Sequence, residues 1–175
     1  MDEARVIGGK YRLERAIGRG GMGAIWVAFD PQLKRRVALK RMVAEHLASP
    51  TARARFEQEA MAIARLQHPN VIHVYDYGID DDTPYIAMEL LEGEDLDARL
   101  RRETRLRPSV VAQLLGQIAK ALSVAHEAGI VHRDLKPANI FIARAGSQEV
   151  VKLLDFGVAA MREALAGAAA TRPGM

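Results

Sequence analysis

The stretch VHRDLKPAN, residues 131–139, decides how this chain is interpreted. It places the carboxylate of Asp134, the ammonium of Lys136 and the amide of Asn139 close together, in a segment stiffened by a proline. A second carboxylate, Asp155, follows in the tripeptide DFG. Transfer of a phosphoryl group requires these parts: a carboxylate to orient a hydroxyl, a lysine beside the moving charge, and two oxygen ligands for Mg²⁺.

The spacing H-R-D-L-x-x-x-N, followed by D-F-G, is a signature of protein kinases. The chain therefore resembles the bacterial branch of the eukaryotic-type serine/threonine protein kinases, and Lys136-Pro137 is similar to the Ser/Thr class rather than the tyrosine class. The resemblance covers residues 11–175 and ends within the activation segment, because no A-P-E motif follows. By domain size it corresponds to about two-thirds of a kinase domain.

Composition excludes several classes of protein. The 175 residues are 49% apolar and 27% charged, which indicates a globular chain with room for one domain or two small lobes. A net charge of +3, with scattered basic residues, favours no nucleic acid partner. The absence of cysteine excludes disulfides, thiolate zinc sites and cysteine catalysis. No apolar run approaches the ~18 residues of a membrane helix, and no signal-peptide core is present, so we expect no membrane segment and a cytoplasmic location.

Two regions of different character follow one another along the chain. The first is mostly strand-like, at residues 11–18, 24–29, 36–42, 71–77 and 85–91, with a helix that begins near residue 50 and ends at residues 68–70. The second is mainly helical, at residues 95–102 and 108–128, with short strands at 140–143 and 150–154. One face of its long helix is expected to hold the side chains of Leu114, Leu115, Ile118, Leu122 and Ala125.

This order is that of the bilobal kinase fold, so we expect the α+β class and a protein-kinase-like structure. A complete small β-rich lobe with one long helix should comprise residues 1–91. A partial helical large lobe should comprise residues 92–175.

A glycine cluster, G-x-G-x-x-G at Gly18, Gly20 and Gly23, follows the first expected strand. Glycines let the backbone approach phosphate oxygens and point N–H groups at them, but the same string occurs in Rossmann folds and in ordinary turns. A Rossmann loop should open a helix, whereas residues 24–29 are strand-like, so a hairpin covering the phosphates is favoured. The resemblance includes Gly21 among the nucleotide-binding residues.

The tetrapeptide VALK, residues 37–40, matches the kinase V-A-I-K element. Lys40 would contact the α- and β-phosphates and needs a carboxylate to hold it. Glu59, inside the expected helix, is the candidate, because Glu57 points about 160° away around the helix.

The resemblance implies roles for the residues of both motifs. Asp134 would accept or orient the proton of the substrate hydroxyl, and Lys136 would neutralise charge on the γ-phosphate. Asn139 and Asp155 would hold Mg²⁺ through hard oxygen ligands. The adenosine contacts are assigned only by alignment to the motifs: Ile25 and Ala38 as the roof, Phe141 as the floor, Met88 as the gatekeeper, backbone groups of Glu89 and Leu91 at the adenine edge, and Asp95 at the ribose.

The function that this resemblance implies is transfer of the ATP γ-phosphoryl group to a protein Ser or Thr, with ATP and Mg²⁺ as cofactors and with self-association for autophosphorylation. His132 is expected to pack under Phe156. Arg133 would pair with a phosphorylated activation segment, for which Thr171 is a candidate, although a disordered tail residue is as good a description of Thr171. The rival interpretation is a nucleotide-binding or scaffold module without phosphotransfer, because the substrate platform of a kinase lies beyond the matched part.

Overall fold

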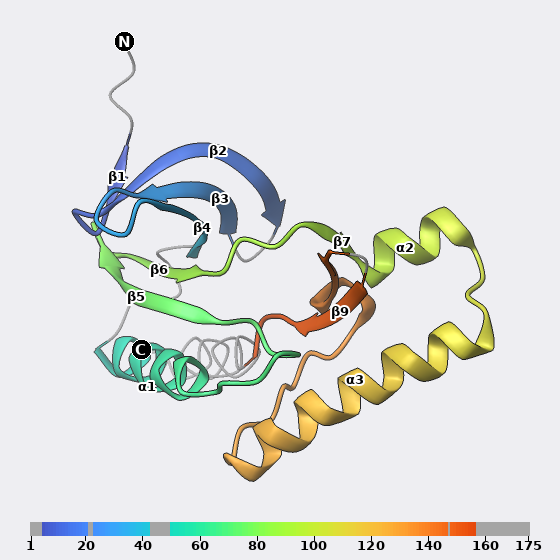
Figure 1. Cartoon of the computed structure of the whole chain (residues 1–175). Coiled ribbons are helices and arrows are strands. Elements are labelled where there is room, and N and C mark those ends of the chain that lie inside the picture. Colours follow the sequence, from blue (N-terminus) through green and yellow to red (C-terminus); the bar gives the residue numbers. More distant parts are fainter. Residues whose placement is uncertain (1–4, 21–22, 43–49, 147, 157–175) are drawn as a thin grey trace, which may run out of the picture. The chain divides into compact units, whose positions relative to one another are not determined.

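The structure, a computed structural model, describes residues 5–20, 23–42, 50–146 and 148–156 (Figure 1). These residues form two compact units. The first unit holds the described residues up to 64 together with 74–90, and the second holds residues 65–73 and 91–156. The division at residues 91 and 92 expected from the sequence stays a prediction. Thr171 lies outside the described residues.

The first unit is built on an antiparallel sheet with the strand order β1-β2-β3-β4-β6-β5. The strands are β1 (Val6–Ile7), β2 (Tyr11–Gly20), β3 (Gly23–Asp30), β4 (Arg35–Met42), β5 (Val74–Asp80) and β6 (Thr83–Met88). Helix α1 (Pro50–Ala64) packs on β5, where the rings of Phe56 and Tyr77 meet edge to face with centroids 6.4 Å apart. A buried core joins Ile7, Tyr11, Ala28, Val37, Leu39, Tyr85 and Ala87.

The second unit combines helices with a small antiparallel sheet of order β7-β8-β9. Its elements are β7 (Gly93–Asp95), α2 (Leu96–Glu103), α3 (Pro108–Glu127), a short 3₁₀ helix (Pro137–Asn139), β8 (Ile140–Ala145) and β9 (Gln148–Leu153). Helix α3 packs against β9 and buries one stripe of side chains: Leu114, Ile118, Ala121 and Ala125.

The expected kinase-like α+β fold is confirmed, with differences in detail. Strands β1 and β7 were not expected, because two or three residues carry too little pattern to announce a strand. The expected burial of Leu115 is wrong: its side chain is 57% exposed, while that of Leu114 is buried. Successive helical residues point about 100° apart, so the stripe that includes Ala121 excludes Leu115.

Residues 65–73 belong to the second unit because they pair with the outer edge of β9. The Ile72 amide donates to the Leu153 carbonyl at 3.0 Å, and the Leu153 amide donates to the Asn70 carbonyl at 2.8 Å. The amide group of Asn70, 6% exposed, adds side-chain hydrogen bonds to Gln117 and to the Val151 carbonyl. The segment therefore satisfies an edge of β9 that the sheet itself leaves open.

Helices of the described part of the chain are all too short or too polar to cross a membrane.

Candidate active site

The glycine-rich hairpin and the lysine-bearing strand face each other through the register of the first sheet. Gly18 lies opposite Ile25, and Ile25 lies opposite Lys40. Ala38, two residues before Lys40, lies opposite Met88. Residues directly opposite one another, and residues two apart on one strand, share a face of a sheet. The structure therefore brings these five expected site residues to one face of the first unit.

Lys40 lies in an unusual environment for a lysine, because its side chain is only 5% exposed. Glu59 lies on the same side of α1 as the buried residues Phe56, Ala60 and Ile63, at helical spacing, and is half-buried, whereas Glu57 is exposed. This orientation favours Glu59 over Glu57 as the partner of Lys40. The pairing itself stays a prediction.

Gly23 closes the hairpin of the glycine-rich segment opposite Gly20. Its φ of 129° is a conformation that only glycine adopts readily, and a β-carbon there would overlap the Arg41 carbonyl oxygen. The close approach of β3 to β4 at this point thus depends on glycine. Gly21 lies outside the described residues.

Replacing Gly23 should therefore destabilise the hairpin. We expect Gly23→Ala to lower the free energy of unfolding by roughly 1–3 kcal/mol, measured by urea denaturation. Gly9→Ala is the matched control, because Gly9 also has a positive φ, 63°, but has open space where a β-carbon would lie. An equal loss in both variants would contradict a specific clash at Gly23.

Asp134, Lys136 and Asn139 of the VHRDLKPAN stretch, called the catalytic loop below, form one hydrogen-bonded cluster. The Lys136 ammonium nitrogen lies 2.8 Å from Oδ2 of Asp134. The Asn139 amide nitrogen donates to the Asp134 carbonyl at 2.7 Å and to its Oδ2 at 3.1 Å. The bond from Lys136, followed by that from Asn139, holds the pKa of the Asp134 carboxyl below its usual range. Asp134 is therefore ionised near neutral pH, and neither of these partners engages its Oδ1.

His132 is buried and holds the H-R-D-L-x-x-x-N stretch against the residues around Asp155. It is 2% exposed, its ring centroid lies 4.6 Å from that of Phe156, and its Nε2 lies 2.8 Å from the Leu154 carbonyl oxygen. With the proton on Nε2, its Nδ1 accepts from the Asp134 amide at 3.4 Å. Arg133, between His132 and Asp134 in the chain, has a φ of 62°. This left-handed conformation turns His132 inward and leaves Asp134 partly exposed. The expected packing of His132 under Phe156 is confirmed.

The buried imidazole should make stability depend on pH. Burial lowers the pKa of His132, so the unfolded chain binds a proton more readily than the folded one. Stability should therefore be full above the unfolded pKa of about 6.5 and fall as the pH drops below it. Urea denaturation at pH 7 and pH 5 measures this loss.

His132→Phe keeps a ring beside Phe156 but cannot titrate, so this pH-dependent loss should shrink. His126→Gln, a change at an exposed histidine of α3, should leave it intact. The same pH dependence in His132→Phe as in the parent chain would contradict the assignment.

Asn139 also fixes the start of the DFG segment. The Leu154 amide donates to the Asn139 carbonyl at 2.9 Å, which ties the residue before Asp155 to the catalytic loop. Asp155 has a φ of 56°, another left-handed conformation at a non-glycine residue. Because the amide nitrogen of Asn139 is engaged with Asp134, its amide oxygen is the atom left for a cation. An amide oxygen and a carboxylate are ligands that suit Mg²⁺.

The remaining expected contacts of the second unit are Asp95, Phe141 and Leu91. Asp95 lies opposite Phe141 in the β7–β8 pair. Its Oδ1 caps α2 by accepting from the Ala98 amide at 2.7 Å, so one carboxylate oxygen already has a structural role. Leu91 and, in the first unit, Glu89 are half-buried residues of the segment that follows β6.

Two residues outside the motifs, Asn70 and Gln117, also support the site and were not expected from the sequence. Both hold the edge of β9, and β9 leads directly to Asp155. The only signal for Asn70 was the turn His68-Pro69-Asn70, in which the Asn70 amide bonds to Nδ1 of His68 at 3.2 Å. Gln117 on α3 carried no signal at all.

Comparison with known proteins gives consistent relatives. The model of the protein kinase domain family matches residues 11–169. The serine/threonine-protein kinase PknA of Mycobacterium tuberculosis is 42% identical over 97% of this chain and 39% of its own length, and the serine/threonine-protein kinase pkn3 of Myxococcus xanthus is 43% identical over 97% of this chain and 32% of its own length. This chain thus spans less than half the length of these relatives.

Among solved structures, the crystal structure of the M. tuberculosis PknI kinase domain superposes with a TM-score of 0.77 at 30% identity, over 90% of this chain and 63% of that one. The family model, the related sequences and the solved structure all indicate the same family. The chain belongs to the protein kinase domain family, in which it is homologous to bacterial serine/threonine protein kinases.

Proposed function

We propose that this chain binds ATP with Mg²⁺ and carries the residues that transfer the γ-phosphoryl group to Ser or Thr hydroxyls of proteins. The hydrogen-bonded cluster of Asp134, Lys136 and Asn139 is the observation that carries the proposal. It holds a carboxylate in its ionised form beside a cation, in the loop where the family performs this reaction.

Asp134 orients the attacking hydroxyl. Its Oδ2 is held by Lys136 and Asn139, so Oδ1 is the oxygen that accepts the hydroxyl hydrogen bond and later its proton. Lys136 lies next to that carboxylate and offsets negative charge on the transferred group. The left-handed backbone at Arg133 keeps this arrangement in place before substrate arrives.

Asn139, through its amide oxygen, and Asp155, through its carboxylate, would hold Mg²⁺. Bound there, the ion neutralises charge on the phosphate oxygens. The hydrogen bond from Leu154 to Asn139 keeps these two ligand residues on adjoining segments.

Each unit holds residues that the family resemblance assigns to the nucleotide. In the first unit, Gly18, Gly20, Gly21 and Gly23 would approach the phosphates, Lys40 with Glu59 would bind them, and Ile25, Ala38, Met88 and Glu89 would contact adenine. In the second unit, Leu91 and Phe141 would complete the adenine contacts and Asp95 would reach the ribose. The cross-strand placement of Ile25, Ala38 and Met88 supports an apolar surface for a flat ring.

By itself the chain should bind nucleotide and transfer phosphate weakly. It covers 63% of the PknI kinase domain, and rapid transfer needs a substrate serine held in line with Asp134. Self-association for autophosphorylation and a cytoplasmic location are further proposals drawn from the family and the sequence. The alternative is a nucleotide-binding or scaffold module without phosphotransfer, and a measurement of phosphate transfer from ATP to a protein decides between the two.

Calorimetry with ATP and Mg²⁺ tests the binding part of the proposal. We expect saturable binding that weakens at least about tenfold in Asp155→Ala and in Lys40→Ala, because each change removes a charge that contacts phosphate or metal. Asp97→Ala, at a partly exposed residue in the first turn of α2, is the control and should bind as the parent chain does. Binding that is indifferent to both site changes would refute the nucleotide site.

A further inference from the structure

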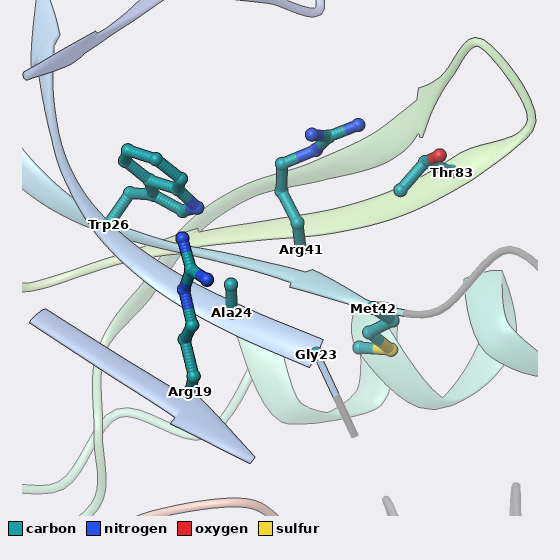
Figure 2. Close-up of a pocket in the computed structure, with 7 residues that line it drawn as sticks. All are labelled: Arg19, Gly23, Ala24, Trp26, Arg41, Met42 and Thr83. Carbon is teal, nitrogen blue, oxygen red and sulfur yellow. The ribbon is translucent and has the colours of Figure 1, made fainter. Parts of the chain in front are cut away.

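A pocket lies on the face of the first sheet that carries Arg41, opposite the face that carries Lys40. It measures about 460 Å³ and is lined by Arg19, Gly23, Ala24, Trp26, Arg41, Met42 and Thr83 (Figure 2). Register places Arg19 opposite Ala24 and Ala24 opposite Arg41, one residue along from the row of Gly18, Ile25 and Lys40. Adjacent residues of a strand point to opposite faces of the sheet. The side chains of Arg19, Ala24 and Arg41 therefore lie on one face, and those of Ile25 and Lys40 lie on the other.

Arg41 is the most informative residue of this pocket. Its Nε is buried and has no hydrogen-bond partner among the described residues, and its side chain extends from β4 toward Thr83 at the start of β6 (Figure 2). Burial, followed by the nearby charge of Arg5, lowers the pKa of Arg41, whereas the carboxylates of Asp80 and Asp81 act in the opposite direction. A buried donor of this kind calls for an acceptor that the described chain does not supply.

Both charged residues that line the pocket among the described residues are arginines. Arg19 and Arg41 supply two guanidinium groups, and the charges of Arg5, Asp80 and Asp81 act on that of Arg41. Asp80 already accepts a hydrogen bond from the Gly8 amide at 2.9 Å. Arg19 and Arg41 reach the pocket from β2 and β4, on either side of β3. Two guanidinium groups on separate strands match an anion with several oxygens.

The other lining groups suit the organic part of a ligand. The Trp26 indole offers apolar surface, and the Thr83 hydroxyl can donate one more hydrogen bond. Inorganic phosphate would use only the cationic side of the pocket. A phosphate ester would contact both the arginines and the apolar surface of the indole.

From this lining we propose that the pocket formed by Arg19, Trp26, Arg41 and Thr83 binds a phosphate monoester, with its oxygens on the two arginines and its organic part on the indole. The ester is either a phosphorylated side chain of a protein or a small phosphorylated metabolite. The pocket shares the lining residue Gly23 with the proposed nucleotide site, but the side chains of Arg19, Trp26 and Arg41 lie on the other face of the sheet from Lys40. Because it lies on the outer face of the glycine-rich hairpin, its occupant contacts the strands that carry Gly18, Gly23 and Ile25.

Trp26 is the only tryptophan of the chain, so its fluorescence reports on this pocket directly. We expect phenyl phosphate to change the emission in a saturable way, phenol to leave it unchanged, and inorganic phosphate to bind more weakly than phenyl phosphate. Arg19→Gln and Arg41→Gln should each weaken phenyl phosphate binding about tenfold. Arg15→Gln, at an exposed position of the same strand β2, should leave it unchanged.

Two further arms complete the test. Lys40→Ala should retain phenyl phosphate binding while it loses ATP, which separates a failure of this pocket from a failure of the nucleotide site. A short peptide with phosphothreonine distinguishes the sources: tighter binding than phenyl phosphate supports a phosphoprotein, and weaker binding supports a metabolite. An unchanged Trp26 emission, equal binding of phenol, or binding that survives both arginine changes would overturn the proposal.

Discussion

Asp134→Asn should lower the rate of phosphoryl transfer by about 10²–10⁴-fold, the usual contribution of a positioned general base. The amide keeps the size of the carboxylate but cannot accept the proton of the substrate hydroxyl. It also places an uncharged group beside Lys136, which now bonds to Oδ2 at 2.8 Å. The measurement is transfer of labelled phosphate from ATP to a basic protein, made with a longer chain that carries this sequence within a complete kinase domain.

Binding of ATP separates this effect from a general loss of structure. Asp134→Asn should bind ATP with Mg²⁺ nearly as well as the parent chain, whereas Asp155→Asn should lose both binding and transfer. Asp97→Asn controls for loss of an ordinary surface carboxylate, since Asp97 pairs only with Arg101 of the same helix among the described residues. Transfer that persists in Asp134→Asn would show that another group orients the hydroxyl.

The sequence indicated which side chains lie together in the H-R-D-L-x-x-x-N stretch better than it indicated the backbone that supports them. Asp134, Lys136 and Asn139 were singled out because they match a family motif, and the structure joins them by hydrogen bonds, while their catalytic roles stay a prediction. The left-handed conformations of Arg133 and Asp155 were not predictable in this way. Such conformations are usual for glycine, and here the surrounding contacts of His132 and Asn139 impose them.

Features that depend on the register of the strands could not be predicted from the sequence either. Arg19 and Arg41 are far apart in the chain, and only the pairing of β2 and β4 with β3 brings them to one pocket. The same pairing places Ile25 and Lys40 on the other face, although the V-A-L-K element had already suggested the role of Lys40. Cross-strand neighbours are set by turns and by bulges, which alternation of residue types along one strand does not reveal.

Asn70→Ala should produce the largest loss of stability that we expect from a position outside the motifs, roughly 2–3 kcal/mol. The side-chain nitrogen of Asn70 donates to the Val151 carbonyl at 2.8 Å and to Oε1 of Gln117 at 2.9 Å. Gln117 in turn accepts from the Val151 amide at 2.9 Å. Val151 is fully buried, so truncation of Asn70 leaves its carbonyl oxygen without that donor and away from water.

A double-mutant cycle with Gln117→Ala tests this account, with urea denaturation as the measurement. Each single change removes one of the two side chains that satisfy the outer edge of β9 at Val151, and both share the bond between Asn70 and Gln117. The losses should therefore fall short of additivity by about 0.5–1 kcal/mol in the double variant. Because β9 leads to Asp155, Asn70→Ala should also weaken ATP binding in the presence of Mg²⁺. Full additivity, or a loss below about 0.5 kcal/mol for Asn70→Ala, would mean that water or a shifted backbone satisfies Val151 instead.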